Sequence, residues 1–402
     1  MSTPEAFLIG GSRTPVGRYG GALSSVRPDD LAALCIKDVI EKSGLDPAVV
    51  DEVILGNANG AGEENRNVAR MAWLLNGYPD TVPGITVNRL CASGMSAIHM
   101  AAHMIKAGAA DIVIAGGVES MSRAPWVMEK PTTAFAKPRE VCDTSIGWRF
   151  VNPIFAQREK FTYSMPETAE EVARLDGITR EEADAFAVRS HELAIAAIEA
   201  GKFKDEIVPV TITDRKGNTT VVDTDEGPRP GTTAEVLAKL RPVVDGGEVV
   251  TAGNSSSLND GASALIVASE AAIKKYGLTP RARFVDGATA GLAPEIMGLG
   301  PVPATEKVLE RTGWRIDQIG AVELNEAFAT QSLASMRRLG INPDIVNSDG
   351  GAIALGHPLG FSGSRILITL LGRMERENVN RGLATMCIGV GQGAATLVER
   401  VK

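Results

Sequence analysis

Residues 87–108 read VNRLCASGMSAIHMAAHMIKAG, a stretch in which an extended apolar lead-in ends at a lone cysteine and small residues then open an apolar helix. Residues 356–374, GHPLGFSGSRILITLLGRM, follow the same order from a glycine-rich turn into an apolar helix. Both stretches close on an apolar strand that runs into glycines, at 111–117 and at 383–393. An element order repeated in this way predicts two related halves packed together.

The rest of the N-terminal third alternates short apolar strands with longer helical patterns, as at 6–9, 29–43 and 52–55. This alternation is typical of an α/β fold with a buried sheet. The last third resembles it in order, because residues 317–324 match the pattern of 48–55 and an asparagine follows shortly after each. The residues therefore predict an α/β fold with a duplicated half.

Residues 122–249 differ from both halves, because proline, charge and acidic helical patterns dominate there. Within this segment, VPVTITDRKGNTTVVD has the alternation and the glycine turn of a β-hairpin. We therefore expect three units along the chain. They are an N-terminal half of residues 1–121 plus 250–273, an inserted loop domain of residues 122–249, and a C-terminal half of residues 274–402.

The composition excludes several classes of protein. The 402 residues are 44% apolar and 22% charged, which is ordinary for a globular protein and unlike a disordered or fibrous chain. A net charge of −8 and only 4% aromatic residues argue against a nucleic-acid-binding protein. No apolar run approaches the roughly 18 residues of a membrane-spanning helix, and the first residues lack a signal-peptide pattern. We expect a cytoplasmic protein that binds neither membrane nor nucleic acid.

The four cysteines, at positions 35, 91, 142 and 387, lack the spacing of a metal site or of a disulfide framework. We therefore expect free thiols and no bound metal. Cys91 differs from the others because it lies where a strand meets a helix, and unpaired backbone N–H groups there favour a thiolate. Lowering a thiol pKa by about two units requires roughly 2.7 kcal/mol, whereas a helix terminus typically supplies about 0.3–1 kcal/mol. A reactive Cys91 therefore needs a second group.

Of the four histidines, His357 is the best candidate for that second group. It lies in a glycine-rich turn at the junction equivalent to that of Cys91. His99 and His103 have i, i+4 spacing but lack the glutamate of a zinc helix, so we expect them to serve helix packing. His191 lies on a charged helical segment and is expected to be exposed.

Cys387 ends an apolar strand and leads into the glycines of CIGVGQG at 387–393. Their spacing does not match a dinucleotide-binding turn, and glycine here is better explained as allowing backbone N–H groups to approach a substrate oxygen. Cys91, Cys387, His357 and Asn325 thus remain as candidates at glycine-rich junctions.

Four segments together resemble the signature blocks of the thiolases, in the same order and spacing: NRLCASGM at 88–95, LNEAF at 324–328, GGAIALGHPLG at 350–360 and CIGVGQG at 387–393. The resemblance spans nearly the whole chain. It implies duplicated α/β halves packed face to face in αβαβα layers, with an inserted loop domain. It also implies a homotetramer built as a dimer of dimers.

The resemblance implies a ping-pong reaction in which CoA is a substrate and no tightly bound cofactor is needed. Cys91 would take the acyl part of a 3-oxoacyl-CoA as an acyl-cysteine, and His357 would activate it. Cys387 would be the acid and base for departing acetyl-CoA and incoming CoA. Asn325 would hold a water that, with His357, binds the thioester oxygen. The tetrahedral intermediate would rest on the backbone N–H groups of Cys91 and Gly389.

For CoA binding, the TAGNSSS segment resembles the pantetheine-binding block, with Ala252 and Ser256 at the matching positions. Met165 and Phe328 would line the acyl tunnel. The chain departs from the short-chain biosynthetic thiolases at Ser164, where a histidine is expected. This difference puts the identity of the acyl chain in doubt.

Residues 56–72, Arg89 and residues 143–153 resemble the 3-oxoadipyl-CoA thiolases, which complete aromatic degradation by yielding succinyl-CoA and acetyl-CoA. The 3-oxoadipyl chain ends in a carboxylate, for which arginine is the best-matched partner. Our hypothesis is that Arg149, or failing that Arg89, binds this carboxylate. The alternative is that both arginines are structural.

Three interpretations of function remain. The preferred one is thiolysis of 3-oxoadipyl-CoA, and the second is a general 3-ketoacyl-CoA thiolase or an acetyl-CoA acetyltransferase. The third, from another class, is a non-catalytic acyl-CoA or lipid carrier on the same fold. Binding alone needs no paired thiols, so the presence of Cys91 with Cys387 argues against the carrier.

Overall fold

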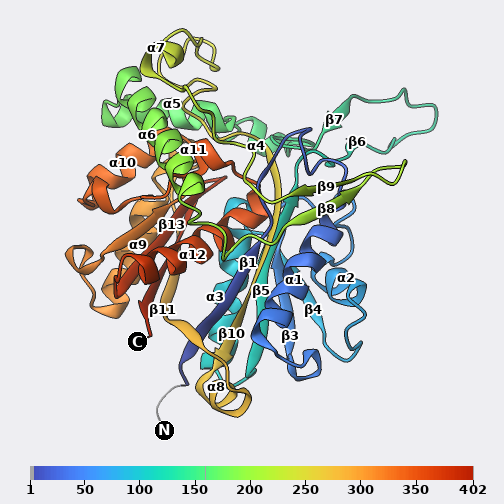
Figure 1. The fold of residues 1–402 in the computed structure, drawn as a ribbon. Helices are drawn as coiled ribbons and strands as arrows, with labels where there is room; N and C mark the ends of the chain where they lie inside the picture. Colours follow the sequence, from blue (N-terminus) through green and yellow to red (C-terminus); the bar gives the residue numbers. More distant parts are fainter. Residues whose placement is uncertain (1–3, 159, 402) are drawn as a thin grey trace.

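The computed structural model describes residues 4–158 and 160–401 (Figure 1). Ten strands form one mixed sheet in the order β12-β13-β14-β11-β1-β10-β5-β3-β4, with β2 paired to β10. The strands of this sheet are β1 (Ala6–Arg13), β2 (Gly17–Arg18), β3 (Glu52–Gly56), β4 (Gly84–Val87), β5 (Ile112–Ser120), β10 (Asn259–Ser269), β11 (Pro280–Gly291), β12 (Ala321–Leu324), β13 (Arg381–Ile388) and β14 (Gln392–Arg400).

The sheet is pseudo-symmetric about the antiparallel pair β1 and β11. On one side, β10 and β5 follow antiparallel to their neighbours and β3 is parallel to β5. On the other side, β14 and β13 follow antiparallel and β12 is parallel to β13. The predicted duplication is therefore confirmed, since β1, β10, β5 and β3 match β11, β14, β13 and β12 in order and direction.

Helices cover both faces of the sheet and also lie between its two halves. The helices of the two halves are α1 (Pro28–Ser43), α2 (Val68–Leu75), α3 (Ser93–Lys106), α8 (Glu270–Tyr276), α9 (Pro301–Thr312), α10 (Ala329–Leu339), α11 (Ala352–Leu355) and α12 (Leu359–Arg376). The 3-10 turns are η1 (Pro47–Val49), η2 (Leu90–Ala92), η3 (Pro294–Leu299), η4 (Ile316–Gln318) and η5 (Pro343–Ile345).

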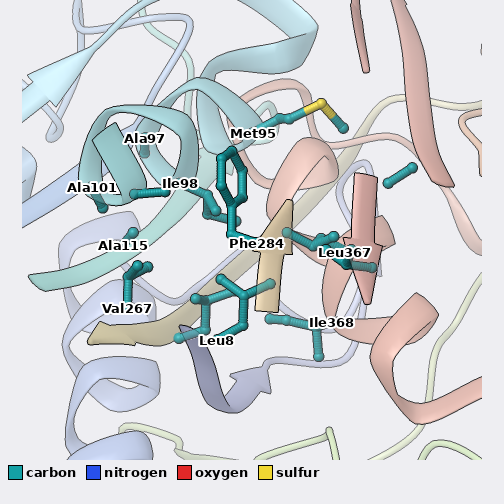
Figure 2. Packing of buried hydrophobic residues seen from close by; sticks show 14 of the residues in the cluster. Leu8, Met95, Ala97, Ile98, Ala101, Ala115, Val267, Phe284, Leu367 and Ile368 are labelled. Carbon is teal, nitrogen blue, oxygen red and sulfur yellow. The ribbon is translucent and has the colours of Figure 1, made fainter. Parts of the chain in front are cut away.

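Three apolar clusters define the layers. The central cluster joins α3 and α12 to strands of both halves, and Figure 2 shows Ile98 of α3 and Leu367 of α12 close to Phe284 of β11. A second cluster packs α1 and α2 on the N-terminal strands, and a third packs α9 and α10 on the C-terminal strands. The order is helix, sheet, helix, sheet, helix, as predicted, but the two half-sheets are also joined edge to edge through β1 and β11.

The described part of the chain between the halves forms eight further elements. They are β6 (Trp126–Met128), β7 (Val141–Asp143), α4 (Pro153–Ala156), α5 (Met165–Asp176), α6 (Arg180–Glu199), β8 (Val210–Thr213), β9 (Thr219–Val222) and α7 (Ala234–Leu237). Of these, α5 and α7 lie at the top of Figure 1 and the hairpins β6–β7 and β8–β9 at its right. The predicted hairpin is confirmed as β8 and β9, and the Asp214 carboxylate closes its turn by accepting the backbone N–H of Lys216 and of Asn218. Within the described residues, no helix is long and apolar enough to cross a membrane.

The two central helices approach β5 through glycine backbone. A Cβ added to Gly117 of β5 would overlap the carbonyl oxygen of Gly360 in α12 and would lie 3.1 Å from Cα of Gly94 in α3. A Cβ added to Gly94 would in turn lie 2.6 Å from the Ser364 hydroxyl. Only the absence of side chains at these positions lets the middle layer close on the strand.

We expect Gly117→Ala to lower the free energy of unfolding by about 1–3 kcal/mol, because the added methyl overpacks a rigid backbone contact. Urea denaturation is the measurement. Gly60→Ala is the matched control, since the nearest atom to its added Cβ is 3.9 Å away. Equal unfolding midpoints for the two variants would contradict this account of the middle layer.

Candidate active site

Cys91 lies in η2, between β4 and α3, and is buried. Leu90 before it has φ of +48°, a conformation that non-glycine residues rarely adopt, so the chain turns sharply into the cysteine. Burial raises the pKa of the Cys91 thiol to about 11, although the backbone N–H of Gly389 donates to the sulfur and lowers the pKa in part. The helix start is therefore insufficient, as the sequence indicated, and the resting group is a thiol.

His357 lies in the turn between α11 and α12, and its imidazole is buried. Its Nδ1 is 2.6 Å from the Ser362 hydroxyl, which donates its own proton to the carbonyl oxygen of Pro358 at 2.7 Å. Because that hydroxyl has only one proton, it accepts from Nδ1–H, and Nε2 is left without a proton. Burial, aided by the charge of Arg365, lowers the pKa of His357 to about 3. The ring is therefore a neutral base at physiological pH.

Asn325 follows β12 and lies beside this base. Its side-chain Nδ2 is 3.4 Å from Nε2 of His357. Three hydrogen bonds hold the backbone of Asn325. Its N–H donates to the carbonyl oxygen of Thr385 at 3.0 Å, and its carbonyl oxygen accepts from the Gln331 side chain at 2.9 Å and from the Ala327 N–H at 3.1 Å. Its Oδ1 is buried and has no hydrogen-bond partner within residues 4–158 and 160–401. This oxygen can accept a hydrogen bond from a water or from a substrate group.

Cys387 is the next-to-last residue of β13 and lies in a small apolar cluster with Met165 and Phe328. Burial raises the pKa of its thiol, and the neighbouring Cys91 raises it further. The turn that follows contains Val390 at φ +62°, a conformation that non-glycine residues rarely adopt. The structure thus brings the two cysteines together and surrounds the second with the residues expected to line an acyl tunnel.

The TAGNSSS segment passes next to this cluster. The backbone N–H of Ser256 donates to the carbonyl oxygen of Ala327 at 2.9 Å, and Ser255 forms a β-bridge with Phe328. Ala252 is exposed, and Ser256 is half-buried. The segment expected to bind pantetheine therefore begins at the surface and leads to the residues around Cys387.

The two candidate arginines differ in their partners. Arg89 donates to the Ser96 hydroxyl at 2.9 Å and to the Gln392 side chain at 3.3 Å, so it links α3 to β14. Arg149 is half-buried and donates through Nη2 to Oδ1 of Asn59 at 3.2 Å. Arg89 has the contacts of a structural residue, whereas Arg149 retains donors for a further acceptor.

The other three histidines make contacts with residues outside the candidate active site. His99 is buried with Nε2 at 2.7 Å from the Thr396 hydroxyl, and its ring packs edge-on against Phe284, as does that of His103. The packing role expected for both is confirmed. The expectation that His191 is exposed is wrong: it is buried, and its Nδ1 accepts the backbone N–H of Arg229 from the segment that covers α6.

Sequence reasoning missed two side chains of this region. Ser362 sets the tautomer of His357, and its only signal was a hydroxyl near the start of an otherwise apolar helix. Glu119 is a buried carboxylate at the end of β5 whose Oε2 accepts the backbone N–H of Gly360 at 2.8 Å. The feature that points to it is a glutamate near the end of a strand in which all nine residues are buried.

Comparison with known proteins identifies the family to which this chain belongs. Family models of the thiolase N-terminal domain and the thiolase C-terminal domain match residues 6–271 and 278–400. The chain belongs to the thiolase family. The thiolase fold predicted from the sequence is therefore confirmed, and the chain is an acyltransferase.

Known thiolases match this chain along its full length. The beta-ketoadipyl-CoA thiolase of Pseudomonas aeruginosa is 56% identical over 99% of each chain. The 3-oxoadipyl-CoA/3-oxo-5,6-dehydrosuberyl-CoA thiolase of Escherichia coli is 55% identical over 99% of this chain and 100% of its own. The crystal structure of the Bacillus anthracis acetyl-CoA acetyltransferase is 40% identical, with a TM-score of 0.93 over 100% of both chains.

We expect Ser362→Ala to lower kcat of this thiolase at least about tenfold, because the imidazole loses the acceptor that keeps Nε2 free of a proton. Thiolysis of acetoacetyl-CoA, followed by loss of the enolate absorbance, is the measurement. Ser364→Ala is the matched control: it lies on the same helix but bonds Ser263 and the carbonyl oxygen of Phe361. If both variants lost activity equally, the assigned tautomer would be wrong.

Proposed function

We propose that this thiolase cleaves 3-oxoadipyl-CoA with CoA to give succinyl-CoA and acetyl-CoA. The observation that carries the proposal is full-length identity of 55–56% to two thiolases named for this substrate, against 46% and 40% to two acetyl-CoA acetyltransferases. Residues 56–72, Arg89 and residues 143–153 also resemble the 3-oxoadipyl-CoA thiolases. CoA is a substrate of the reaction, and the proposed mechanism requires no tightly bound cofactor.

In the proposed first half-reaction, the Cys91 thiol gives its proton to Nε2 of His357 as the sulfur attacks the 3-oxo carbon. The oxyanion is held by the backbone N–H groups of Cys91 and Gly389 in a dry site, where such bonds are strong. The bond between C2 and C3 then breaks, leaving an acyl-cysteine and the enolate of acetyl-CoA. His357 and a water on Asn325 stabilise the enolate oxygen, and the Cys387 thiol protonates C2.

The second half-reaction reverses these roles. The Cys387 thiolate takes the proton of incoming CoA, whose sulfur attacks the acyl-cysteine. The tetrahedral intermediate collapses, Cys91 leaves, and its sulfur regains the proton held by His357. The low pKa of His357 and the high pKa of the Cys91 thiol support a proton transfer that occurs only when substrate arrives, rather than a permanent ion pair.

The substrate path is proposed from the same contacts. Ala252 and Ser256 would bind the pantetheine arm, because their segment leads from the surface to the cluster around Cys387. Met165 and Phe328, which belong to that cluster, would contact the acyl chain. The proposed division into residues 1–121 with 250–273, 122–249 and 274–402 gives the inserted part of the chain the role of binding CoA and the acyl chain.

Arg149 is proposed to bind the terminal carboxylate of the acyl chain. It comes from the inserted segment, is half-buried, and makes one side-chain hydrogen bond, to Asn59. A guanidinium has five N–H donors, so donors remain for a bidentate bond to a carboxylate. Arg89 is the weaker candidate, because two of its nitrogens already bind Ser96 and Gln392.

We expect the wild-type thiolase to show a higher kcat/KM for 3-oxoadipyl-CoA than for acetoacetyl-CoA, and Arg149→Ala to reduce that preference at least about tenfold. The reason is the loss of a charge-assisted bond, roughly 1.5–3 kcal/mol. Steady-state thiolysis on both substrates is the measurement. Arg139→Ala is the control, because Arg139 lies in the same inserted segment and pairs only with Glu129 in the contacts that the structure records. An unchanged preference in Arg149→Ala would show that Arg149 does not bind the carboxylate. Equal wild-type kcat/KM on the two substrates would contradict the proposed substrate.

The thiolase is also proposed to work in the cytoplasm as a homotetramer. The hairpin of β6 and β7 extends from the body of the molecule (Figure 1). The segment from β6 to α4 carries exposed large apolar side chains, among them Trp126, Met128, Phe135 and Ile154. Apolar side chains gathered on one exposed segment are typical of an interface.

We expect light scattering after gel filtration to give the mass of a tetramer for the wild type and a smaller species for the Trp126→Ser, Met128→Ser double variant. Both substitutions remove apolar area that an interface would bury. Leu175→Ser, at an exposed site on α5, is the control and should not change the mass. A wild type that elutes as a monomer would contradict the proposed assembly.

A further inference from the structure

Glu119 is a carboxylate that the proposed reaction does not use, although it lies between the two halves. It is the next-to-last residue of β5, and only 2% of the residue is exposed. Its Oε2 accepts the backbone N–H of Ala58 at 2.9 Å and that of Gly360 at 2.8 Å. Its Oε1 accepts the backbone N–H of Asn59 at 3.1 Å and the side-chain amide of Asn57 at 3.3 Å. One buried carboxylate thus binds four donors.

The donor on Gly360 belongs to the first turn of α12, immediately after the turn that holds His357. The first N–H groups of a helix have no partner within the helix, and a carboxylate placed there satisfies one of them and favours the positive end of the helix dipole. The fit is close, because a Cβ added to Gly360 would lie 2.7 Å from the carbonyl oxygen of Val118 and 2.9 Å from Glu119 itself. Glu119 therefore joins the strand that follows α3 to the helix that follows His357.

The other donors come from the loop after β3, which is itself tied to the inserted segment. The Asn59 side chain donates to the backbone oxygen and to the hydroxyl of Thr144, both at 3.0 Å. The same side chain accepts from Arg149. The two segments that resemble one subfamily, 56–72 and 143–153, are therefore in contact through Asn59. The backbone N–H of Asn59 in turn binds Glu119, which also binds the start of α12 after His357.

We propose that Glu119 is a positioning residue for catalysis: by binding the Gly360 N–H and the loop at residues 57–59 together, it sets the place of His357 relative to Cys91. The proposal rests on the roles proposed for Cys91 and His357, and it is independent of which acyl chain the thiolase prefers. Glu119 does not itself touch the reacting atoms. Its effect passes through the backbone of Gly360.

The alternative is that Glu119 acts on Cys91 only through its charge. This alternative predicts the opposite change in Cys91 reactivity when Glu119 is replaced. The groups that face this carboxylate are Glu64, Arg149 and Cys91, and burial raises the pKa of Glu119 to about 7. The charge of Glu119 raises the pKa of the Cys91 thiol. Removing only the charge should therefore make Cys91 more reactive, whereas moving His357 away should make it less reactive.

The test compares Glu119→Ala, Glu119→Gln and the matched control Glu64→Gln, in the full-length thiolase. Glu64 is a buried carboxylate next to Glu119, and its pKa is likewise raised, to about 8, mainly by burial, but it makes no recorded bond to α12. Thiolysis of 3-oxoadipyl-CoA and acetoacetyl-CoA gives kcat and KM. The rate of Cys91 alkylation by iodoacetamide between pH 6 and pH 9, read by peptide mass spectrometry, reports the thiol without any acyl substrate.

For Glu119→Ala we expect kcat to fall about 100-fold on both substrates, since a displacement of about 1 Å at a catalytic group has this effect. The KM for CoA should stay within about twofold, and Cys91 alkylation at pH 7 should slow despite the lost charge. Glu119→Gln keeps one acceptor oxygen and the side-chain shape, so it should recover part of kcat. Glu64→Gln should match the wild type.

Several outcomes would overturn the proposal. One is faster alkylation of Cys91 with unchanged kcat in Glu119→Ala, which would mean that only the charge acts. Another is wild-type kcat in Glu119→Gln, which is the decisive variant if thermal unfolding shows that Glu119→Ala does not fold. A wrong substrate assignment would appear differently, as a wild-type enzyme that prefers acetoacetyl-CoA while the Glu119 variants still lose kcat on it.

Discussion

The contact of α3 and α12 on the glycines of β5 is the constraint from which the rest of the site follows. Each helix begins beside a candidate catalytic group, Cys91 for α3 and His357 for α12, and both helix starts pack against Gly117. Because protein interiors are close-packed, this shared surface leaves little freedom for one group to move relative to the other. Because the half is duplicated, there are two equivalent helix starts, one after Cys91 and one after His357. The middle layer packs these two helix starts against each other.

Burial in that middle layer sets the protonation states. It raises the pKa of both thiols and lowers that of His357, so all three groups are neutral before substrate arrives. An ion pair formed in advance would need compensation for the loss of water around both charges. Neutral groups avoid this cost, and the charges that develop during reaction meet backbone donors such as the Gly389 N–H.

Much of the fold could be predicted from the sequence because its signals are local. Glycine-rich turns before apolar helices marked both junctions, and the alternation of strands and helices predicted the duplicated α/β halves that the sheet order confirms. The bond from Gly360 to Glu119 could not be predicted, since it joins residues 241 positions apart and depends on how the halves dock. His191 was misjudged for a related reason: its own helix is charged, but a distant segment covers it.

The arrangement separates the part of the molecule that reacts from the part that selects. The residues proposed as nucleophile, base and second thiol all lie on the duplicated halves, whose packing tolerates little change. The candidate carboxylate ligand Arg149 lies on the inserted segment, which contacts the halves through polar side chains such as Asn59. If Arg149 has its proposed role, a substitution in that segment would alter the acyl group accepted without disturbing the helix starts. Glu119 receives hydrogen bonds from the Asn59 loop and from α12, so it holds that loop and the helix start in one fixed arrangement whichever acyl group is accepted.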